Sequence, residues 1–496
     1  MALKIALIVP SGGYYANRWQ KGSLMPPLGI GYIAAVLEQQ GHRVTIVDAY
    51  AENMTNKQLI FCLEQLAPDV AGVTFTTENR FEAFETIKLC KQTLPECKTM
   101  AGGPHVSLAA EDTLSNIQEL DYIIRGEGEK SVVELCQVIE GKGDIESVNG
   151  VTYRKNGTVI HNPDMDFIVD LDSLPFPARH LYNTKKYNFF MDVPGRGKLS
   201  AANIMTSRGC PFHCMFCAST INWGSRFRFR SPENILEEII YLKNKFGVQS
   251  IWFFDDTFTA NRKQTEKLCE MILEKDLNIS WFCEIRVDTV DFELLKKMKE
   301  AGCYFIGFGI ESGSQRILDE VIGKKIKLEQ VENIRTWSKE LNIIANPFFI
   351  LSHPTESYEE GQATMELMEK WSKDFPVSLS LMHVYPGTKL EKLAYKKKIL
   401  PEGFSWATPE VKGVITLPGA QGNVPIFVDK LEWNQITEMM VKWASKQKYS
   451  IWKRIPKVFR SIRSYDDAKL YLTMAVVYFK LKINLFLGRF FNNEIE

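Results

Sequence analysis

Three cysteines stand close together in one short segment with the spacing C-x3-C-x2-C: Cys210, Cys214 and Cys217. Thiolates at such a spacing typically bind zinc or an iron–sulfur cluster. A structural zinc site closes with four ligands, usually from two C-x2-C pairs, and no second pair exists in this sequence. Three thiolates on a [4Fe–4S] cluster would leave one iron open for a small molecule. The spacing therefore predicts a metal site with these three cysteines as its ligands.

The cysteines follow the first of six segments with the apolar and aromatic composition of buried strands. Helical stretches such as PENILEEIIYLKNKFG separate these segments. Six such units indicate a barrel, complete or partial, whose functional residues lie at the carboxyl ends of its strands. The expected strands are 201–207, 250–256, 279–285, 303–311, 343–351 and 377–385.

The first part of the chain also alternates strand and helix, which predicts an α/β domain with a doubly wound parallel sheet. In such a sheet, ligands bind outside the carboxyl ends of the strands. Glycines and small residues cluster at these ends, where they let backbone N–H groups approach a ligand. The expected strands are 4–11, 43–49, 70–76, 98–103 and 121–126, and the expected helices are 29–41, 59–69, 80–94 and 129–141.

These patterns predict four regions. The doubly wound domain covers 1–144. Residues 145–197 contain a hairpin with its turn at Asn156-Gly157, followed by a proline-rich linker. The barrel covers 198–420, and 421–496 is a helical C-terminal region with a basic stretch at 452–463.

The cysteine segment SRGCPFHCMFCAST resembles the signature of the radical S-adenosylmethionine (SAM) superfamily, and Phe216 fills the aromatic place before the last cysteine. The resemblance implies that the amino and carboxylate groups of SAM chelate the open iron. It also implies that an electron from the cluster cleaves the sulfonium bond and yields a 5′-deoxyadenosyl radical. The cofactors carry this chemistry, and the protein supplies placement and water exclusion.

Further segments of the predicted barrel match common positions of that superfamily: FFDDTF, EIRVD, FGIESGS and VYPGT. A zwitterion with a ribose needs cationic, hydroxyl and carboxylate partners at strand ends. For Arg286, the alternative to a role in SAM binding is a structural ion pair with Asp288 or with a neighbouring strand. The turn LSHPTES departs from the familiar G-x-P-G-E-T form, with Ser352 and Thr355 in the glycine places. The residues that the resemblance assigns to SAM binding are Phe216, Glu284, Arg286, Glu311 and Ser312.

The first domain is similar to the cobalamin-binding domain that precedes the barrel in one branch of the superfamily. PPLGIGYIAAVLEQQGHRVTIVDA, AGGPH and RGEGE carry this resemblance. The D-x-H-x-x-G motif of many cobalamin proteins is absent, so we expect TTENR (76–80) to face the corrin. For His105 we favour a hydrogen-bonding turn residue over a cobalt ligand. The residues that the resemblance assigns to cobalamin are Thr76, Thr77, Glu78, Gly102, Gly103, His105, Gly126 and Glu127.

The two resemblances together imply a cobalamin-dependent radical SAM enzyme. The leading reading is a methyltransferase that acts on an unactivated carbon through a 5′-deoxyadenosyl radical and methylcobalamin. The closest alternative is a cobalamin-dependent oxidative cyclase of the tetrapyrrole pathway or a ring-rearranging enzyme, in which no methyl group is transferred.

Two other functions are less compatible with the sequence. A methylthiotransferase would carry further cluster cysteines in its N-terminal domain, whereas Cys62, Cys90 and Cys136 here fit apolar helix faces as inert thiols. A cobalamin- or cluster-based sensor would usually carry an output domain, and we recognise none. Cys303 is interpreted as a packed strand thiol.

Charge and composition set the expected partners and location. Lysine plus arginine equals aspartate plus glutamate at 60 each, so nucleic acid is not an expected partner. We expect a small-molecule or natural-product substrate and an electron donor such as flavodoxin or ferredoxin. Neither an export signal nor a membrane span is recognised, which favours the cytoplasm. The apolar stretch 468–491 could contact a membrane surface, but we favour packing on the protein itself.

Overall fold

The computed structural model describes residues 2–11, 24–187, 189–409, 411–416 and 423–446. The chain divides into two units, Met1–Lys430 and Leu431–Glu496, and helix α14 (Trp433–Lys446) is the described element of the second unit. The basic stretch 452–463 and the apolar stretch 468–491 lie outside the described residues. Within the described ranges, no helix combines the length and apolarity that a bilayer crossing requires.

The first sheet has seven strands in the order β2-β1-β3-β4-β5-β6-β7. Strands β1 to β5 are parallel to their neighbours, and β6 and β7 extend the edge in antiparallel fashion. The order reverses next to β1, which confirms the doubly wound topology. The strands are β1 (Lys4–Val9), β2 (Arg43–Asp48), β3 (Val70–Thr74), β4 (Lys98–Gly102), β5 (Tyr122–Ile124), β6 (Val151–Lys155) and β7 (Thr158–His161).

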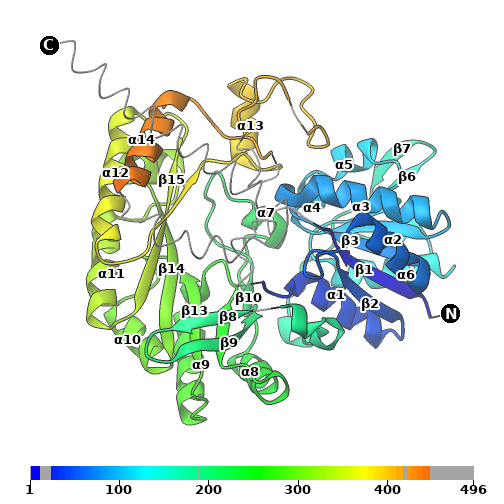
Figure 1. Cartoon of the computed structure of the whole chain (residues 1–496), viewed down its shortest axis with the longest axis horizontal. Helices are drawn as coiled ribbons and strands as arrows, with labels where there is room; N and C mark the ends of the chain where they lie inside the picture. Colours follow the sequence, from blue (N-terminus) through cyan, green and yellow to red (C-terminus); the bar gives the residue numbers. More distant parts are fainter. Residues whose placement is uncertain (1, 12–23, 188, 410, 417–422, 447–496) are drawn as a thin grey trace. The chain divides into compact units, whose positions relative to one another are not determined.

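Helices cover both faces of this sheet because its strands are apolar on both sides (Figure 1). Ile5 and Leu7 of β1 pack with α1 and α6, whereas the alternating residues Ala6 and Ile8 pack with α2 and α3. Burial of each large aliphatic side chain contributes about 1.5–3 kcal/mol. The helices are α1 (Leu28–Gln39), α2 (Asn56–Leu66), α3 (Arg80–Thr93), α4 (Pro104–Leu108), α5 (Ala110–Asn116) and α6 (Gly128–Ile139).

The hairpin β6–β7 turns at Asn156-Gly157, as the sequence predicts. Both turn residues have positive φ, 52° and 80°, which asparagine and glycine tolerate better than other residues. The hairpin pairs with β5 and so continues the first sheet.

The second sheet has the order β16-β15-β14-β13-β12-β9-β8. The six expected strands are present and parallel to their neighbours in chain order, which confirms a partial barrel. The additional strand β8 pairs antiparallel with β9 in a segment expected to be linker. The strands are β8 (Phe190–Val193), β9 (Gly197–Ile204), β12 (Ser250–Phe253), β13 (Ser280–Ile285), β14 (Cys303–Glu311), β15 (Ile344–Leu351) and β16 (Ser378–Leu381).

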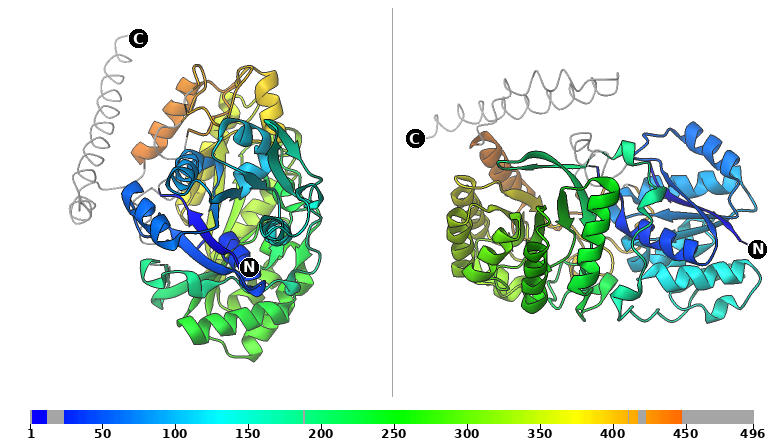
Figure 2. Two further views of the ribbon diagram at one scale, coloured as in Figure 1. Left: turned by 90° about the vertical axis from the view of Figure 1, so that its right-hand side faces the viewer. Right: turned by 90° about the horizontal axis from the view of Figure 1, so that it is seen from below.

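The outer face of the second sheet is covered by helices (Figure 2). Local sequence sets the ends of these helices. In α8, for example, the Ser231 side chain accepts from the Asn234 N–H and Gly247 ends the helix at φ 65°. The covering helices are α8 (Pro232–Phe246), α9 (Arg262–Glu274), α10 (Phe292–Glu300), α11 (Leu328–Glu340) and α12 (Tyr358–Ser372), and α13 (Lys389–Lys396) follows β16.

A small two-stranded ribbon is formed by the part of the chain that connects β9 to α8. Strand β10 (Ser207–Arg208) pairs antiparallel with β11 (Arg228–Phe229), and helix α7 (Ser219–Trp223) lies between them in sequence. The three cysteines at 210, 214 and 217 therefore lie on a loop whose two ends are joined by the ribbon. We call residues 209–218 the cysteine loop.

Candidate functional site

The cysteine loop follows strand β9 and lies on the carboxyl-end side of the barrel, where the sequence predicts function. Its middle is anchored by backbone hydrogen bonds, from the Met215 N–H to the Ile322 carbonyl and from the Leu390 N–H to the Met215 carbonyl, each 3.1 Å. These anchors come from segments that follow β14 and β16. Cys210, Cys214, Phe216 and Cys217 are all half-buried.

Burial and nearby positive charges act in opposite directions on the pKa of the Cys210 and Cys214 thiols. Burial raises the pKa of all three thiols, that of Cys217 to about 12. They would therefore stay protonated at neutral pH unless a metal displaced the protons. Lys324 and Arg286 act in the opposite direction on the Cys214 pKa, because their positive charges favour the thiolate.

The described residues contain no group of three His, Cys, Asp or Glu side chains placed to hold one metal ion. A four-iron cluster places a different requirement on its ligands, since each thiolate binds a different iron and the sulfur atoms need not converge on one point. The cluster assignment therefore rests on the spacing of the cysteines and on their position at the carboxyl end of the barrel.

Arg286, at the carboxyl end of β13, forms the structural ion pair that the sequence left open, and its expected role at SAM stays a prediction. Its Nε and Nη2 donate to the two carboxylate oxygens of Asp288 at 2.9 and 2.8 Å, so the structural ion pair exists. Its guanidinium also lies 3.5 Å from the centre of the Phe212 ring in the cysteine loop. Arg286 thus connects β13 with the cysteine loop by a cation–π contact.

Glu311 ends β14 with φ 73°, an uncommon backbone conformation for glutamate. Its carboxylate accepts from the Lys324 ammonium at 2.6 Å, and both side chains are buried. A Cβ on Gly309 would lie only 1.9 Å from this carboxylate and 2.5 Å from the ammonium, so the ion pair needs glycine at that position. Ser312 is fully buried, and its hydroxyl contacts the Thr364 hydroxyl at 3.2 Å.

Acidic side chains gather above β12 and β13. Burial, assisted by Asp256, Asp255 and Glu311, raises the pKa of Glu284 to about 7. Burial also raises the pKa of Asp255 to about 6, although it accepts from the Thr206 N–H and from Ser207. Glu284 can therefore be protonated or ionised near neutral pH, and it can donate or accept a hydrogen bond.

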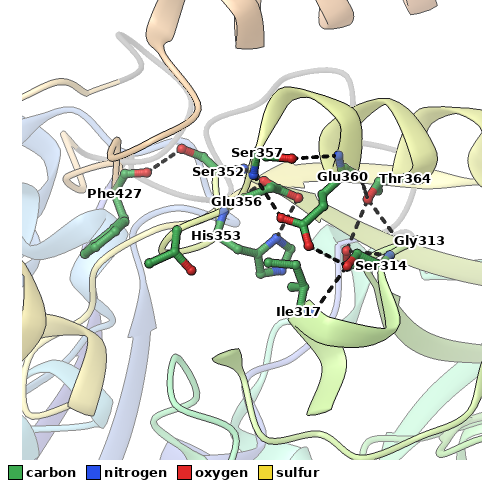
Figure 3. A network of polar contacts seen from close by, with 12 residues as sticks. Gly313, Ser314, Ile317, Ser352, His353, Glu356, Ser357, Glu360, Thr364 and Phe427 are labelled. Atoms are coloured by element: carbon green, nitrogen blue, oxygen red, sulfur yellow. Dashed lines mark hydrogen bonds and ion pairs between the residues drawn. The ribbon is translucent and has the colours of Figure 1, made fainter. Parts of the chain in front are cut away.

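The turn after β15 keeps the backbone shape that glycine would allow (Figure 3). Ser352 and Thr355, in the expected glycine places, have φ 74° and 60°. Glu356 holds the turn together, since its Oε2 accepts from the N–H groups of Ser352 and His353 at 2.7 and 3.0 Å. The altered turn thus preserves its left-handed positions at a cost in backbone strain.

In the first domain, TTENR forms a tight turn after β3. The Thr76 N–H donates to the Asn79 side chain at 2.8 Å, and Glu78 accepts from the Tyr385 hydroxyl at 2.7 Å. Arg80 is buried and donates to the carbonyls of Trp406 and Thr77 at 2.7 and 2.6 Å. This segment therefore joins the first sheet to loops of the barrel region.

His105 is fully buried beside this segment. Its Nδ1 lies 3.1 Å from the Thr77 hydroxyl, and its Nε2 has no hydrogen-bond partner among the described residues. Burial, with a contribution from Arg80, lowers the pKa of His105 to about 3, so the imidazole is neutral at physiological pH. His105 forms a side-chain hydrogen bond, but it lies in the short helix α4 rather than in the turn that the sequence predicts, because Pro104 begins a helix there.

The glycines at the strand ends leave room for a ligand. A Cβ built on Gly102 or on Gly126 would meet no atom within 4 Å. Gly103 has φ 106°, and a Cβ there would lie 2.7 Å from the Phe75 carbonyl, so only glycine fits. The backbone at Gly102 and Gly126, at the carboxyl ends of β4 and β5, is therefore open to the approach of a ligand.

Glu127 is engaged within the protein. Its carboxylate pairs with Arg228 at 2.6 Å and with Arg208 at 3.6 Å, and it accepts from the Ile168 N–H at 2.8 Å. Any role toward cobalamin would therefore fall to the backbone of this residue, because the carboxylate faces the ribbon β10–β11.

No pattern in the sequence identifies Lys324, Arg208 or Arg228 as site residues. Each becomes recognisable only from a partner that is distant in sequence. A groove of about 360 Å³, lined among others by Arg196, Ser280 and Lys299, lies at the amino ends of β13 and β14. It is therefore remote from the carboxyl ends, where parallel barrels bind substrate.

Comparison with known proteins agrees with this two-part arrangement. The family model described as Radical SAM superfamily matches residues 204–368, and the model described as B12 binding domain matches residues 20–136. The first match includes β12 to β15 of the barrel, and the second includes β2 to β5 of the first sheet.

Similar proteins span most of the chain. An uncharacterized methyltransferase, PH0819, from Pyrococcus horikoshii is 34% identical over 80% of this chain and 84% of its own. The anaerobic magnesium-protoporphyrin IX monomethyl ester cyclase of Rubrivivax gelatinosus is 27% identical over 83% of this chain and 74% of its own. The structure of the radical SAM methyltransferase TsrM from Kitasatospora setae, with cobalamin and a [4Fe–4S] cluster bound, shares the fold. It has a TM-score of 0.70 at 17% identity and covers 89% of this chain and 91% of its own.

Proposed function

The chain belongs to the cobalamin-dependent radical SAM enzymes, and we propose that it transfers a methyl group to an unactivated carbon of a small-molecule substrate. The observation that carries this proposal is the 34% identity, over four-fifths of the chain, to a protein named as a methyltransferase. The open space beside Gly102 and Gly126 and the three thiols of the cysteine loop support separate sites for two cofactors.

When bound, the cluster with SAM supplies a carbon-centred radical, and cobalamin supplies a methyl carrier. The chain's own residues would hold these groups in place. Cys210, Cys214 and Cys217 would ligate the cluster, and the space beside the glycines of β4 and β5 would admit the corrin. The protein would also exclude water from the reacting groups.

The residues beside the cysteine loop have the charges that a SAM pocket needs. Glu311 and Lys324 present a carboxylate and an ammonium side by side, which complement the amino and carboxylate groups of an amino acid. Glu284, with a pKa of about 7, can hydrogen-bond a hydroxyl in either protonation state. Arg286 would hold the loop in place through Phe212.

A second candidate is a cobalamin-dependent cyclisation or ring rearrangement without methyl transfer. The 27% identity to an anaerobic cyclase over 83% of the chain favours it. Both candidates need the same cofactors, so the fate of the SAM methyl group distinguishes them. Either enzyme would take electrons from a small redox protein such as flavodoxin or ferredoxin.

The proposed location is the cytoplasm, where thiols stay reduced. All ten cysteines lie in the described residues, and all ten are free. With a net charge of zero, the chain has no general attraction for nucleic acid.

Methyl transfer can be tested before the substrate is known. The anaerobically reconstituted chain, with cobalamin bound, is reduced and incubated with SAM that carries ¹⁴C in its methyl group. We expect label to appear in the protein-bound cobalamin, and a sample prepared without cobalamin to bind none. If 5′-deoxyadenosine forms while the bound cobalamin stays unlabelled, the methyltransferase proposal is wrong and the cyclase reading gains support.

A further inference from the structure

Two arginines stand at the two ends of the cysteine loop and its helix α7. Arg208 is the last residue of β10 and precedes Gly209 and Cys210, whereas Arg228 begins β11. They are direct cross-strand partners in the two-stranded ribbon. Like charges opposite each other repel, so the ribbon is stable only if anions neutralise the pair.

The anions come from the segment after β5 in the first domain, more than 75 positions earlier in the chain. Arg208 Nη2 lies 2.5 Å from Glu129 Oε1, and Arg208 Nη1 lies 3.6 Å from Glu127 Oε1. Arg228 binds both oxygens of Glu127, through Nη2 at 2.6 Å and Nη1 at 2.9 Å. All four side chains are at most 7% exposed. We call these four residues the buried tetrad.

The tetrad is packed as well as paired. The Arg208 guanidinium lies 5.4 Å from the centre of the Tyr32 ring and 5.2 Å from that of the Trp223 indole. The Arg228 guanidinium lies 4.9 Å from the Phe167 ring. Each arginine is thus held in one orientation by aromatic faces and carboxylates together.

The backbone between Arg208 and Cys210 is tightly packed, so the position of Arg208 determines that of Cys210. Gly209 has φ 93°, and a Cβ there would lie 2.3 Å from the Arg226 carbonyl, so the base of the loop has no spare room. The Cys210 N–H donates to the Gly224 carbonyl at 3.2 Å. A shift of Arg208 would therefore move Cys210.

The opposite side of the tetrad borders the expected corrin site. Glu127 and Glu129 follow Gly126 by one and three positions. The Gly126 N–H donates to the Ser107 hydroxyl at 3.0 Å, and its α-carbon faces open space. One short segment therefore has a glycine beside the open space at the end of β5 and two carboxylates at the base of the cysteine loop.

From this juxtaposition we infer that the buried tetrad sets the placement of the cysteine loop relative to the cobalamin-binding domain. Arg208 and Glu129 are positioning residues: they touch neither reacting atoms nor metal, and they act through Cys210 and Gly126. The inference rests on the proposed function only in requiring that both cofactors bind.

The test measures the separation of the two cofactors directly. Glu129→Gln and Arg208→Lys chains are loaded with cluster and cobalamin, reduced so that both centres are paramagnetic, and examined by pulsed EPR. We expect both variants to retain iron and cobalamin. We also expect the distribution of cluster-to-cobalt distances to become about twofold wider, because loss of a supporting contact loosens a site by about 1 Å.

Glu238→Gln is the matched control. Glu238 is also a fully buried carboxylate between two arginines, 2.9 Å from Arg179 and 2.5 Å from Arg230. None of these three pairs with the segment after β5. We expect this variant to lower thermal stability as much as Glu129→Gln does, while the distance distribution stays that of the unmodified chain.

Three results would separate the possible failures. Unchanged distance distributions in both tetrad variants, with only stability lowered, would overturn the positioning role. If Glu129→Gln does not fold, Arg208→Lys decides, because it keeps the charge and shortens the reach. An unmodified chain without any cluster–cobalt interaction would instead contradict the proposed function.

Discussion

Replacement of Cys214 with alanine is expected to remove the cluster and to reduce 5′-deoxyadenosine formation to background. Two thiolates cannot hold a four-iron cluster in the position that leaves one iron for SAM. Cys214 lies in the most strongly anchored part of the cysteine loop, next to Met215, whose N–H and carbonyl bind Ile322 and Leu390. The chain should still fold, because alanine keeps these backbone contacts. Iron analysis and chromatography of the nucleoside products measure the two effects.

Cys62→Ala is the control for this variant. Cys62 is half-buried like Cys214 but lies on helix α2 of the first domain. We expect it to retain full iron content and full 5′-deoxyadenosine formation. A Cys214→Ala chain that keeps its iron and still cleaves SAM would show that the cysteine loop does not hold the cluster.

The second large effect is expected on the affinity for cobalamin. Gly102→Leu should weaken cobalamin binding by about 100-fold or more, since a side chain would fill space that the corrin needs. The substitution should leave the fold intact, because a Cβ at Gly102 meets no atom within 4 Å and the residue does not require positive φ. Equilibrium titration with hydroxocobalamin measures the affinity, and the iron content should not change.

Lys98→Leu provides the comparison for the glycine variant. Lys98 is exposed on the same strand, β4, at its amino end, so the same side chain is introduced on the opposite edge of the sheet. We expect unchanged cobalamin affinity. If Gly102→Leu binds cobalamin as tightly as the unmodified chain, the carboxyl end of β4 is not the corrin site.

Much of the fold is readable from the sequence because its periodicity is regular. The five parallel strands of the first sheet, the hairpin at Asn156-Gly157 and the six barrel strands all occur within a few residues of their expected bounds. Strand β8 escaped prediction because Phe190–Val193 lies in a segment of mixed character and is an edge strand that pairs with β9 alone. Strand pairing of this kind depends on tertiary context rather than on local pattern.

Some site residues can also be recognised from the local sequence, whereas others depend on partners that are distant in sequence. The cysteines are recognisable because their spacing is local, and the positive φ of Ser352 and Thr355 follows from their places in a glycine turn. The pairing of Glu129 with Arg208 could not be predicted, since 79 positions separate them and nothing in either segment specifies the other. Glu127 was expected at cobalamin by resemblance, and the structure shows that its carboxylate faces Arg228.

The amounts of iron and cobalamin bound per chain show most directly whether one chain holds both cofactors. The chain is purified without oxygen, its cluster is rebuilt, hydroxocobalamin is added, and excess is removed before iron, cobalamin and protein are measured. We predict near-stoichiometric cobalamin beside about four irons per chain. Iron without retained cobalamin would contradict this prediction, because the first domain would then be a scaffold or a substrate site and methyl transfer would lose its carrier.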